Sequence, residues 1–118
     1  VVEELAVSPE RLRLGGESRD VTLLFADVRG FSRLSEGMEA EQLVRFVNTL
    51  FTPLADEILS HRGTIDKFMG DAVMAFWNAP LADADHARQA CRTALAMQRA
   101  IIALNAERPE TVEPIRLG

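Results

Sequence analysis

Two short apolar segments separated by only two residues constrain the fold of this chain more than any other feature. Residues 64–69 and 72–77 have the length and composition of strands, and Gly70-Asp71 lies between them. A two-residue connection joins neighbouring antiparallel strands, and Gly followed by Asp is compatible with a type II′ turn. The sequence therefore predicts a β-hairpin with Asp71 at its tip.

The segments around this hairpin alternate between strand and helix patterns. Residues 21–28 (VTLLFADV) form a near-continuous apolar run, which is typical of a buried strand. The other predicted elements are a short helix ended by Gly37, a helix over 39–61, a helix from an Asp83 cap to about Arg108 and a strand opening over 114–117. The order β-α-α-β-β-α-β predicts an α+β fold, a ferredoxin-like (palm-type) split βαβ sheet with helices on one face.

Apolar residues at helical spacing predict the core-facing sides of the two long helices. In the first helix they are Leu43, Phe46, Val47, Leu50, Leu54 and Ile58. In the second they are Ala87, Ala90, Cys91, Ala94, Met97, Ile101 and Leu104. Phe76 and Trp77 end the second hairpin strand, and we expect them in the core or at an interface.

Composition narrows the class of protein. The chain has 118 residues, enough for one domain, and is 47% hydrophobic and 26% charged, which excludes a disordered chain. Its net charge of −5 argues against non-specific nucleic-acid binding. The single cysteine excludes an internal disulfide and a multi-cysteine metal site, and no apolar run has the length of a membrane span. We expect this chain to be cytoplasmic, either as part of a cytoplasmic protein or as the cytoplasmic part of a membrane-anchored protein.

The two ends of the chain predict that it is a piece of a longer protein. It starts without methionine, inside a short helical pattern over 1–7, and ends in a strand-like alternation over 115–118. A Ser8-Pro9 turn and a Gly15-Gly16 break follow the first segment. We therefore expect residues 1–19 to be a linker or arm and residues 20–118 to be the folded domain.

Asp27 and Asp71 are the acids that the predicted fold brings together. Asp27 ends a buried strand, where an acid acts either as a turn or helix-cap residue or as a cation ligand beside an anion site. Asp71 is in a tight turn, where aspartate is favoured for backbone reasons alone. In a split βαβ sheet the first strand lies beside this hairpin, so the two carboxylates converge. A pair of Mg²⁺ ions would remove their repulsion and serve phosphoryl chemistry.

Lys67 is a third candidate. Ile65, Phe68 and Met69 around it are all apolar, so the alternation does not fix which face of the sheet Lys67 takes. It is either a lysine whose stem covers a strand edge or a donor aimed at a ring nitrogen or a phosphate.

Two blocks of sequence resemble a known family. Residues 22–32 (TLLFADVRGFS) and residues 63–76 (GTIDKFMGDAVMAF), in this order with a helical segment between them, are similar to the bacterial class III adenylate/guanylate cyclase catalytic domain. The resemblance runs from about Arg19 to the C-terminus and covers the N-terminal portion of such a domain. Residues 1–19 resemble the segment that joins the domain to an upstream regulatory module in bacterial membrane-bound cyclases.

The resemblance implies a role for each matching residue. Asp27 and Asp71, with the Val28 carbonyl, would bind two Mg²⁺ or Mn²⁺ ions. Backbone amides of the loop and helix start would hold the triphosphate; these residues are Arg29, Gly30, Phe31 and Ser32. Lys67 matches the purine-reading lysine of adenylate cyclases, where guanylate cyclases carry a glutamate.

The implied activity is that of an adenylate cyclase, a phosphorus–oxygen lyase. The ribose 3′-oxygen of ATP attacks the α-phosphate, giving 3′,5′-cyclic AMP and pyrophosphate. The implied site forms in a homodimer, in which a second purine-reading residue, an asparagine and an arginine come from beyond Gly118. The implied partners are ATP, a second copy and an upstream sensor domain, without nucleic acid and without membrane contact by this segment.

Two alternatives remain from the sequence. A catalytically inactive cyclase-like module for binding or dimerisation would typically have lost one metal aspartate, and this chain retains both. A cyclic-dinucleotide synthase of the same palm type would carry a Gly-Gly-Asp/Glu-Glu-Phe hairpin, whereas residues 69–73 read MGDAV.

Overall fold

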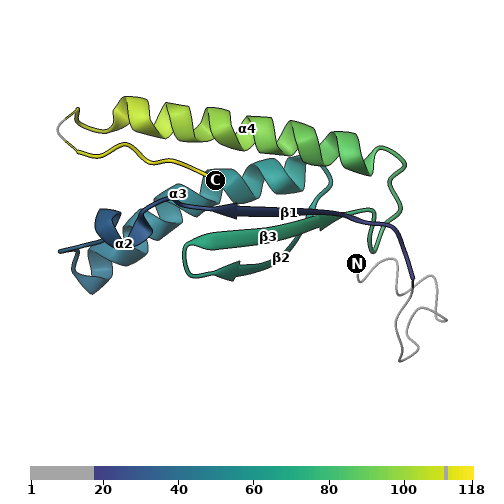
Figure 1. The fold of residues 1–118 in the computed structure, drawn as a ribbon, viewed down its shortest axis with the longest axis horizontal. Helices are drawn as coiled ribbons and strands as arrows, with labels where there is room; N and C mark the ends of the chain where they lie inside the picture. Colours follow the sequence, from purple (N-terminus) through teal and green to yellow (C-terminus); the bar gives the residue numbers. More distant parts are fainter. Residues whose placement is uncertain (1–17, 111) are drawn as a thin grey trace.

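The computed structural model describes residues 18–110 and 112–118. Within these residues two long helices lie side by side on one face of an antiparallel sheet and leave its other face uncovered (Figure 1). The elements are β1 (Thr22–Asp27), α2 (Phe31–Leu34), α3 (Ala40–Ser60), β2 (Thr64–Met69), β3 (Ala72–Trp77) and α4 (His86–Glu107). The predicted α+β architecture is confirmed. The helical pattern at 1–7 and nearly all of the predicted linker lie outside the described residues.

The strand order is β1-β3-β2, with β3 antiparallel to both of its neighbours. β1 and β2 are therefore parallel to each other, and α3 connects them across the intervening strand. This is the split βαβ arrangement that the order of elements predicts. Residues 116–118 add a short pairing at the outer side of β1, with an isolated bridge between Val28 and Leu117. The expected strand from Pro114 is thus shorter than predicted.

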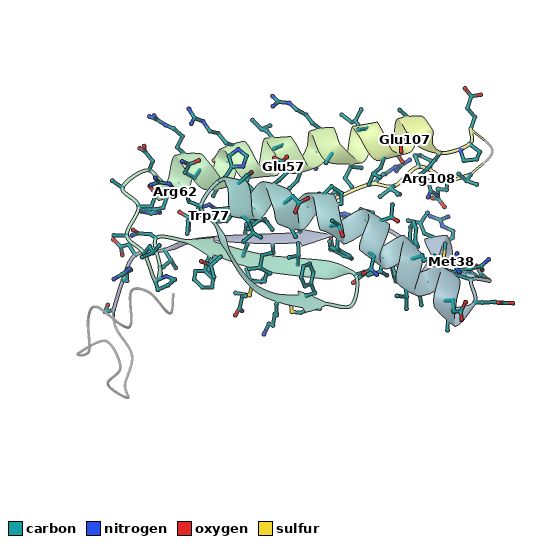
Figure 2. All side chains as sticks on the ribbon, turned by 180° about the vertical axis from the view of Figure 1, so that it is seen from behind. Met38, Glu57, Arg62, Trp77, Glu107 and Arg108 are labelled. Carbon is teal, nitrogen blue, oxygen red and sulfur yellow. The ribbon has the colours of Figure 1, made fainter. Side chains whose placement is uncertain are left out.

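The core lies between the sheet and the two long helices. Val73, Ala75 and Trp77 alternate inward along β3, and Trp77 is completely buried. Figure 2 labels Trp77. Its indole Nε1 donates a hydrogen bond to the His61 carbonyl at 2.9 Å, so the polar group of this buried side chain has a partner. Trp77 is a core residue, one of the two alternatives that the sequence left open.

The predicted core face of α4 was partly wrong. Cys91, Ala87 and Ala94 are exposed, and Thr93 is fully buried. Small residues gain little from burial, so the larger Met97 and its neighbours one turn away decide how the helix is rotated. Thr93 tolerates this position because its hydroxyl donates to the Gln89 carbonyl at 2.7 Å.

Two further expectations need correction. β1 is not buried on both faces: Leu23 is 51% and Phe25 62% exposed, because both long helices cover the opposite face. α4 begins at His86 with Asp85 as its N-cap, not Asp83. The Asp83 side chain instead accepts a hydrogen bond from the Asp85 amide at 2.9 Å, which forms the turn before the helix.

Candidate active site

Asp27 and Asp71 lie at the same end of the sheet on neighbouring chain segments. Asp27 is the last residue of β1 and pairs with Ala72, the first residue of β3. The amide of Val28 donates to the Asp71 carbonyl at 3.0 Å. Figure 1 shows the end of β1, the β2–β3 turn and the C-terminus together at this end. The structure therefore places the end of β1 beside the β2–β3 turn, and the convergence of the two carboxylates stays a prediction.

A two-residue turn fixes the position of Asp71. Met69 and Ala72 are paired, so Gly70 and Asp71 alone make the connection. Gly70 has a φ of 61°, a left-handed value that glycine adopts at little cost, and Asp71 does not have a positive φ. This sign pattern is that of a type II′ turn.

The carboxylate of Asp27 is on the open face of the sheet and 55% exposed. It forms an ion pair with Arg29, whose Nε lies 3.8 Å from Oδ1 and whose side chain is 70% exposed. A solvent-exposed ion pair at this distance is weak. A cation with stronger attraction for oxygen can therefore replace the guanidinium at little cost.

Residues 29–32 form a turn that leads into the short helix α2. Gly30 precedes the helix with a φ of 62°, and its carbonyl accepts from the Arg33 and Leu34 amides at 3.1 and 3.0 Å. Among the described residues, the amides of Phe31 and Ser32 have no acceptor, as is usual in the first turn of a helix. The Phe31 ring stacks on Phe46 of α3 at a centroid distance of 6.2 Å, which holds the turn in place. These amides can donate to a phosphate group.

A bulge in β2 decides the orientation of Lys67. Ile65 pairs with Ala75, but Lys67 pairs with Met74, so Asp66 is an extra residue between them. Met74 also pairs with Phe25 of β1. Directly paired residues project from the same face of a sheet. Lys67 therefore lies on the open face with Phe25, whereas Ile65 packs against the core.

The donor set at this end of the sheet suits Mg²⁺ or Mn²⁺ held together with a phosphate ligand. In the part of the chain that the structure describes, no three His, Cys, Asp or Glu side chains cluster closely enough to enclose a metal ion. Mg²⁺ usually binds one or two protein carboxylates and takes its other oxygens from water and substrate phosphates. Two aspartates beside a turn with free backbone amides fit that chemistry, and they do not fit a closed structural zinc site.

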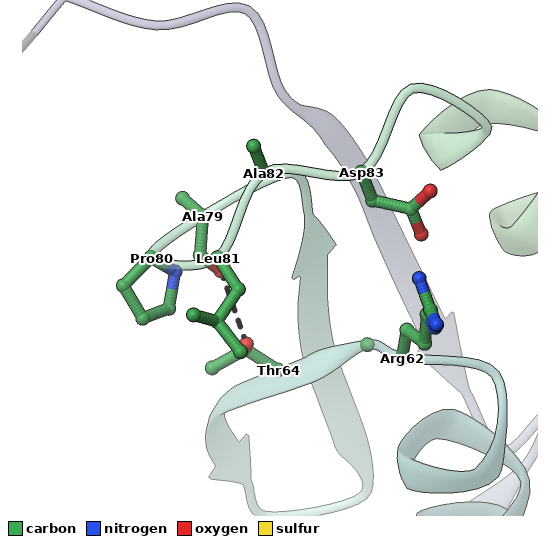
Figure 3. A pocket seen from close by; sticks show the side chains of 8 residues that line it. Arg62, Thr64, Ala79, Pro80, Leu81, Ala82 and Asp83 are labelled. Atoms are coloured by element: carbon green, nitrogen blue, oxygen red, sulfur yellow. Dashed lines mark hydrogen bonds between the residues drawn. The ribbon is translucent and has the colours of Figure 1, made fainter. Parts of the chain in front are cut away.

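A separate cavity of about 560 Å³ lies at the opposite end of the sheet, between the start of β2 and the loop after β3. Arg62, Thr64, Pro80 and Asp83 are among its lining residues, and Thr64 Oγ1 donates to the Ala79 carbonyl at 3.2 Å (Figure 3). None of the predicted site residues lines this cavity. The candidate site is thus at the other end of the sheet and not in this cavity.

Sequence reasoning missed one residue beside Asp27. Gly118 exchanges two backbone hydrogen bonds with Asp27, each 2.8 Å long. The only signal was a glycine within the strand-like alternation over 115–118, where a glycine often marks a close approach of another group.

Comparison with known proteins identifies the family. A profile described as the adenylate and guanylate cyclase catalytic domain matches residues 16–118. The chain belongs to this family. None of the helices of this cyclase domain within the described ranges is long and apolar enough to cross a membrane.

The proteins similar to this cyclase domain include adenylate cyclases and guanylate cyclases. Adenylate cyclase 1 of Rhizobium meliloti is 39% identical over 111 residues, which are 86% of this chain and 17% of that protein. Adenylate cyclase of Anabaena cylindrica is 36% identical over 100 residues, 84% of this chain and 19% of that protein. Among solved structures, guanylyl cyclase Cya2 is 37% identical with a TM-score of 0.80, covering 89% of this chain and 54% of that one.

The adenylyl cyclase CyaB from P. aeruginosa is 35% identical with a TM-score of 0.74, covering 83% of this chain and 53% of that one. The chain thus spans about half of these solved structures and less than a fifth of the two curated relatives. Because the named relatives include both adenylate and guanylate cyclases, the choice of base has to be argued from individual residues.

Proposed function

We propose that this domain supplies the metal-binding half of an adenylate cyclase site, which converts ATP to 3′,5′-cyclic AMP and pyrophosphate. The observation that carries the proposal is the placement of Asp27 and Asp71 on adjacent segments at one sheet end, beside the turn over residues 29–32. In this proposal residues 20–118 are the N-terminal part of the catalytic domain. An upstream sensor domain regulates this catalytic domain, and the protein, or the part of it that contains the domain, is cytoplasmic.

Each residue has a task in this reaction. Asp27 and Asp71, with the Val28 carbonyl, hold two Mg²⁺ or Mn²⁺ ions, which when bound would stabilise negative charge on the attacking and leaving oxygens. The backbone amides of Phe31 and Ser32, in the turn over residues 29–32, orient the triphosphate, whereas the Arg29 amide already donates to the Arg116 carbonyl at 2.9 Å. The ribose 3′-hydroxyl gives up its proton to water, its oxygen forms a bond to the α-phosphorus, and the bond from that phosphorus to the pyrophosphate oxygen breaks. Holding both groups in one geometry lowers the entropic part of the barrier.

Lys67 supports ATP as the substrate. It lies on the open face of the sheet, and a lysine ammonium only donates hydrogen bonds. The N1 atom of adenine is an acceptor, whereas N1 of guanine carries a proton and donates. A lysine can therefore donate a hydrogen bond to N1 of adenine. Against guanine, the lysine ammonium and the protonated N1 would both be donors and could not pair. Guanylate cyclase activity is the second candidate, because Cya2 is among the similar structures.

The open face of the sheet supports a homodimer. Leu23 and Phe25 of β1 and Met69 of β2 are all at least 40% exposed on this face. Figure 2 shows side chains projecting from the sheet on the side away from both helices. A contiguous exposed apolar surface is typical of an interface. We propose that a second copy of the chain covers it and brings the remaining catalytic groups to the two aspartates.

The proposal is tested by assaying the purified full-length protein with ATP or GTP and either Mg²⁺ or Mn²⁺, and by measuring both cyclic nucleotides. We expect cyclic AMP from ATP, strict dependence on the divalent cation, and loss of the product in Asp27→Ala. A protein that binds nucleotide but forms neither product would support the inactive-module alternative. Cyclic GMP as the main product would support the guanylate cyclase alternative.

A further inference from the structure

The side chains of Asp27 and Arg29 lie directly above the Cα atom of Gly118. A β-carbon built on Gly118 would come within 2.8 Å of Asp27 Oδ1 and 2.7 Å of Arg29 Nη2, and it would also crowd Arg29 Nε. Contacts of this length are too short for carbon, so any side chain at position 118 would force the carboxylate and the guanidinium to move. The space above Gly118 is therefore filled by the ends of the Asp27 and Arg29 side chains.

Strand pairing explains why the space is needed at this position. Gly118 and Asp27 exchange both backbone hydrogen bonds, so they are directly opposed and their substituents project from the same face. On the other side, Asp27 is opposed by Ala72. Asp27 thus stands in a row across three chain segments between the two smallest residues, glycine and alanine.

The backbone of Gly118 gives no other reason for a glycine. Its φ is outside the left-handed region, unlike those of Gly30 and Gly70. An alanine is therefore compatible with the backbone conformation, and only crowding of Asp27 and Arg29 opposes it. Both crowded groups are ends of exposed side chains, so they can move without disturbing the core.

We propose that Gly118 is a positioning residue for Asp27: its missing side chain leaves the room that the Asp27 carboxylate and the Arg29 guanidinium occupy, and so keeps Asp27 where it can bind a divalent cation. This inference rests on the proposed role of Asp27 as a metal ligand. Mg²⁺ and Mn²⁺ sites depend on closely defined ligand positions. Displacing a residue that orients a ligand typically weakens metal binding ten- to a hundredfold.

The test is Mn²⁺ binding to the full-length protein, measured by electron paramagnetic resonance as loss of the free-ion signal. We expect Gly118→Ala to raise the Mn²⁺ dissociation constant about tenfold or more, with little change in melting temperature. Arg116→Ala is the matched control, because Arg116 is exposed two residues earlier and projects from the same face. It should bind Mn²⁺ like the wild type.

Two outcomes separate this inference from the proposed function. If wild type and Asp27→Ala bind Mn²⁺ equally, the metal-ligand role of Asp27 fails and the inference fails with it. If Asp27→Ala loses binding but Gly118→Ala binds like the wild type, with or without a loss of thermal stability, Gly118 is only a packing residue. That result overturns the inference and leaves the function standing.

A second variant covers the case in which Gly118→Ala does not fold. Ala72→Val adds bulk beside Asp27 from the opposite strand, and Ala72 is partly exposed. We expect it to weaken Mn²⁺ binding in the same direction. Wild-type affinity in a folded Ala72→Val protein would show that Asp27 does not need small neighbours, which would also overturn the inference.

Discussion

The side-chain amide of Asn105 in α4 binds both backbone groups of Ile115. Nδ2 donates to the Ile115 carbonyl and Oδ1 accepts from the Ile115 amide, each at 2.8 Å. About two turns earlier on the same face of α4, Gln98 Nε2 donates to the Leu117 carbonyl at 3.0 Å. The opposite side of this segment pairs with the end of β1 through Arg116 and Gly118. α4 therefore positions the chain segment that lies beside Asp27.

We expect Asn105→Ala to lower the free energy of unfolding by about 2–3 kcal/mol. The change removes two hydrogen bonds and leaves the amide and carbonyl of the buried Ile115 unpaired. Urea unfolding, followed by circular dichroism, measures the effect. Asn48→Ala, an exposed asparagine in α3, is the control and should stay within about 0.5 kcal/mol of the wild type. A similar small loss in Asn105→Ala would mean that water replaces the amide.

Asp71→Ala should abolish metal-dependent cyclisation and leave the fold intact. The hydrogen bond from Val28 goes to the backbone carbonyl of Asp71, which alanine retains, and the turn depends on Gly70. Cyclic AMP production and the melting temperature are measured together. Asp56→Ala, an exposed acid in α3, controls for the loss of one negative charge. Normal turnover in Asp71→Ala would show that Asp71 has no role in catalysis and only forms the turn.

Lys67→Glu should shift the preference from ATP toward GTP. A carboxylate accepts hydrogen bonds from the protonated N1 and the amine of guanine, and it leaves the adenine N1 without a donor. An unpaired buried polar group costs about 1–3 kcal/mol, or roughly ten- to a hundredfold in kcat/KM. The measurement is the ratio of kcat/KM for ATP to that for GTP in the full-length protein. An unchanged ratio would show that Lys67 does not face the base.

Lys67 is also the single lysine of this chain, which allows a chemical test without mutation. Because its side chain is exposed on the open face, an amine-selective acetylating reagent should modify it in the free protein. Saturating 3′-deoxy-ATP, which lacks the attacking hydroxyl, should slow modification at least several-fold. Peptide mass spectrometry follows the acetylated fraction at residue 67, and adenosine serves as the control for triphosphate-dependent binding. Equal rates with and without the nucleotide would contradict the adenine-contact proposal.

Phe25→Asp should dissociate the proposed homodimer. Phe25 is 62% exposed on the open sheet face, and a carboxylate at an apolar interface would have to be desolvated. Sedimentation velocity of the full-length protein measures the association. Ile102→Asp, a 67% exposed position on the outer side of α4, should leave the association unchanged. If both variants stay associated, the dimer uses another surface.

Local chemistry made parts of this fold predictable. The bounds of β2 and β3 agree with the sequence prediction because a two-residue Gly-Asp connection fixes the pairing next to the turn, whereas the bulge at Asp66 farther along β2 was not predicted. The core face of α4 was harder to predict, since Ala87, Cys91 and Ala94 contribute too little burial energy to fix the rotation of a helix. Gly118 illustrates a different limit, because its neighbour Asp27 is far away in the sequence and only the tertiary pairing brings them together.

The bulge at Asp66 places the side chains before and after it in β2 on opposite faces of the sheet. Ile65 before it packs into the core, and Lys67 after it lies on the open face. Without the extra residue, side chains two apart would share a face, and a change at position 67 would alter the packing that keeps the domain folded. With it, position 67 can change without altering the packing of the core. If Lys67 reads the base as proposed, a gene duplicate can exchange adenine for guanine recognition while the protein stays folded.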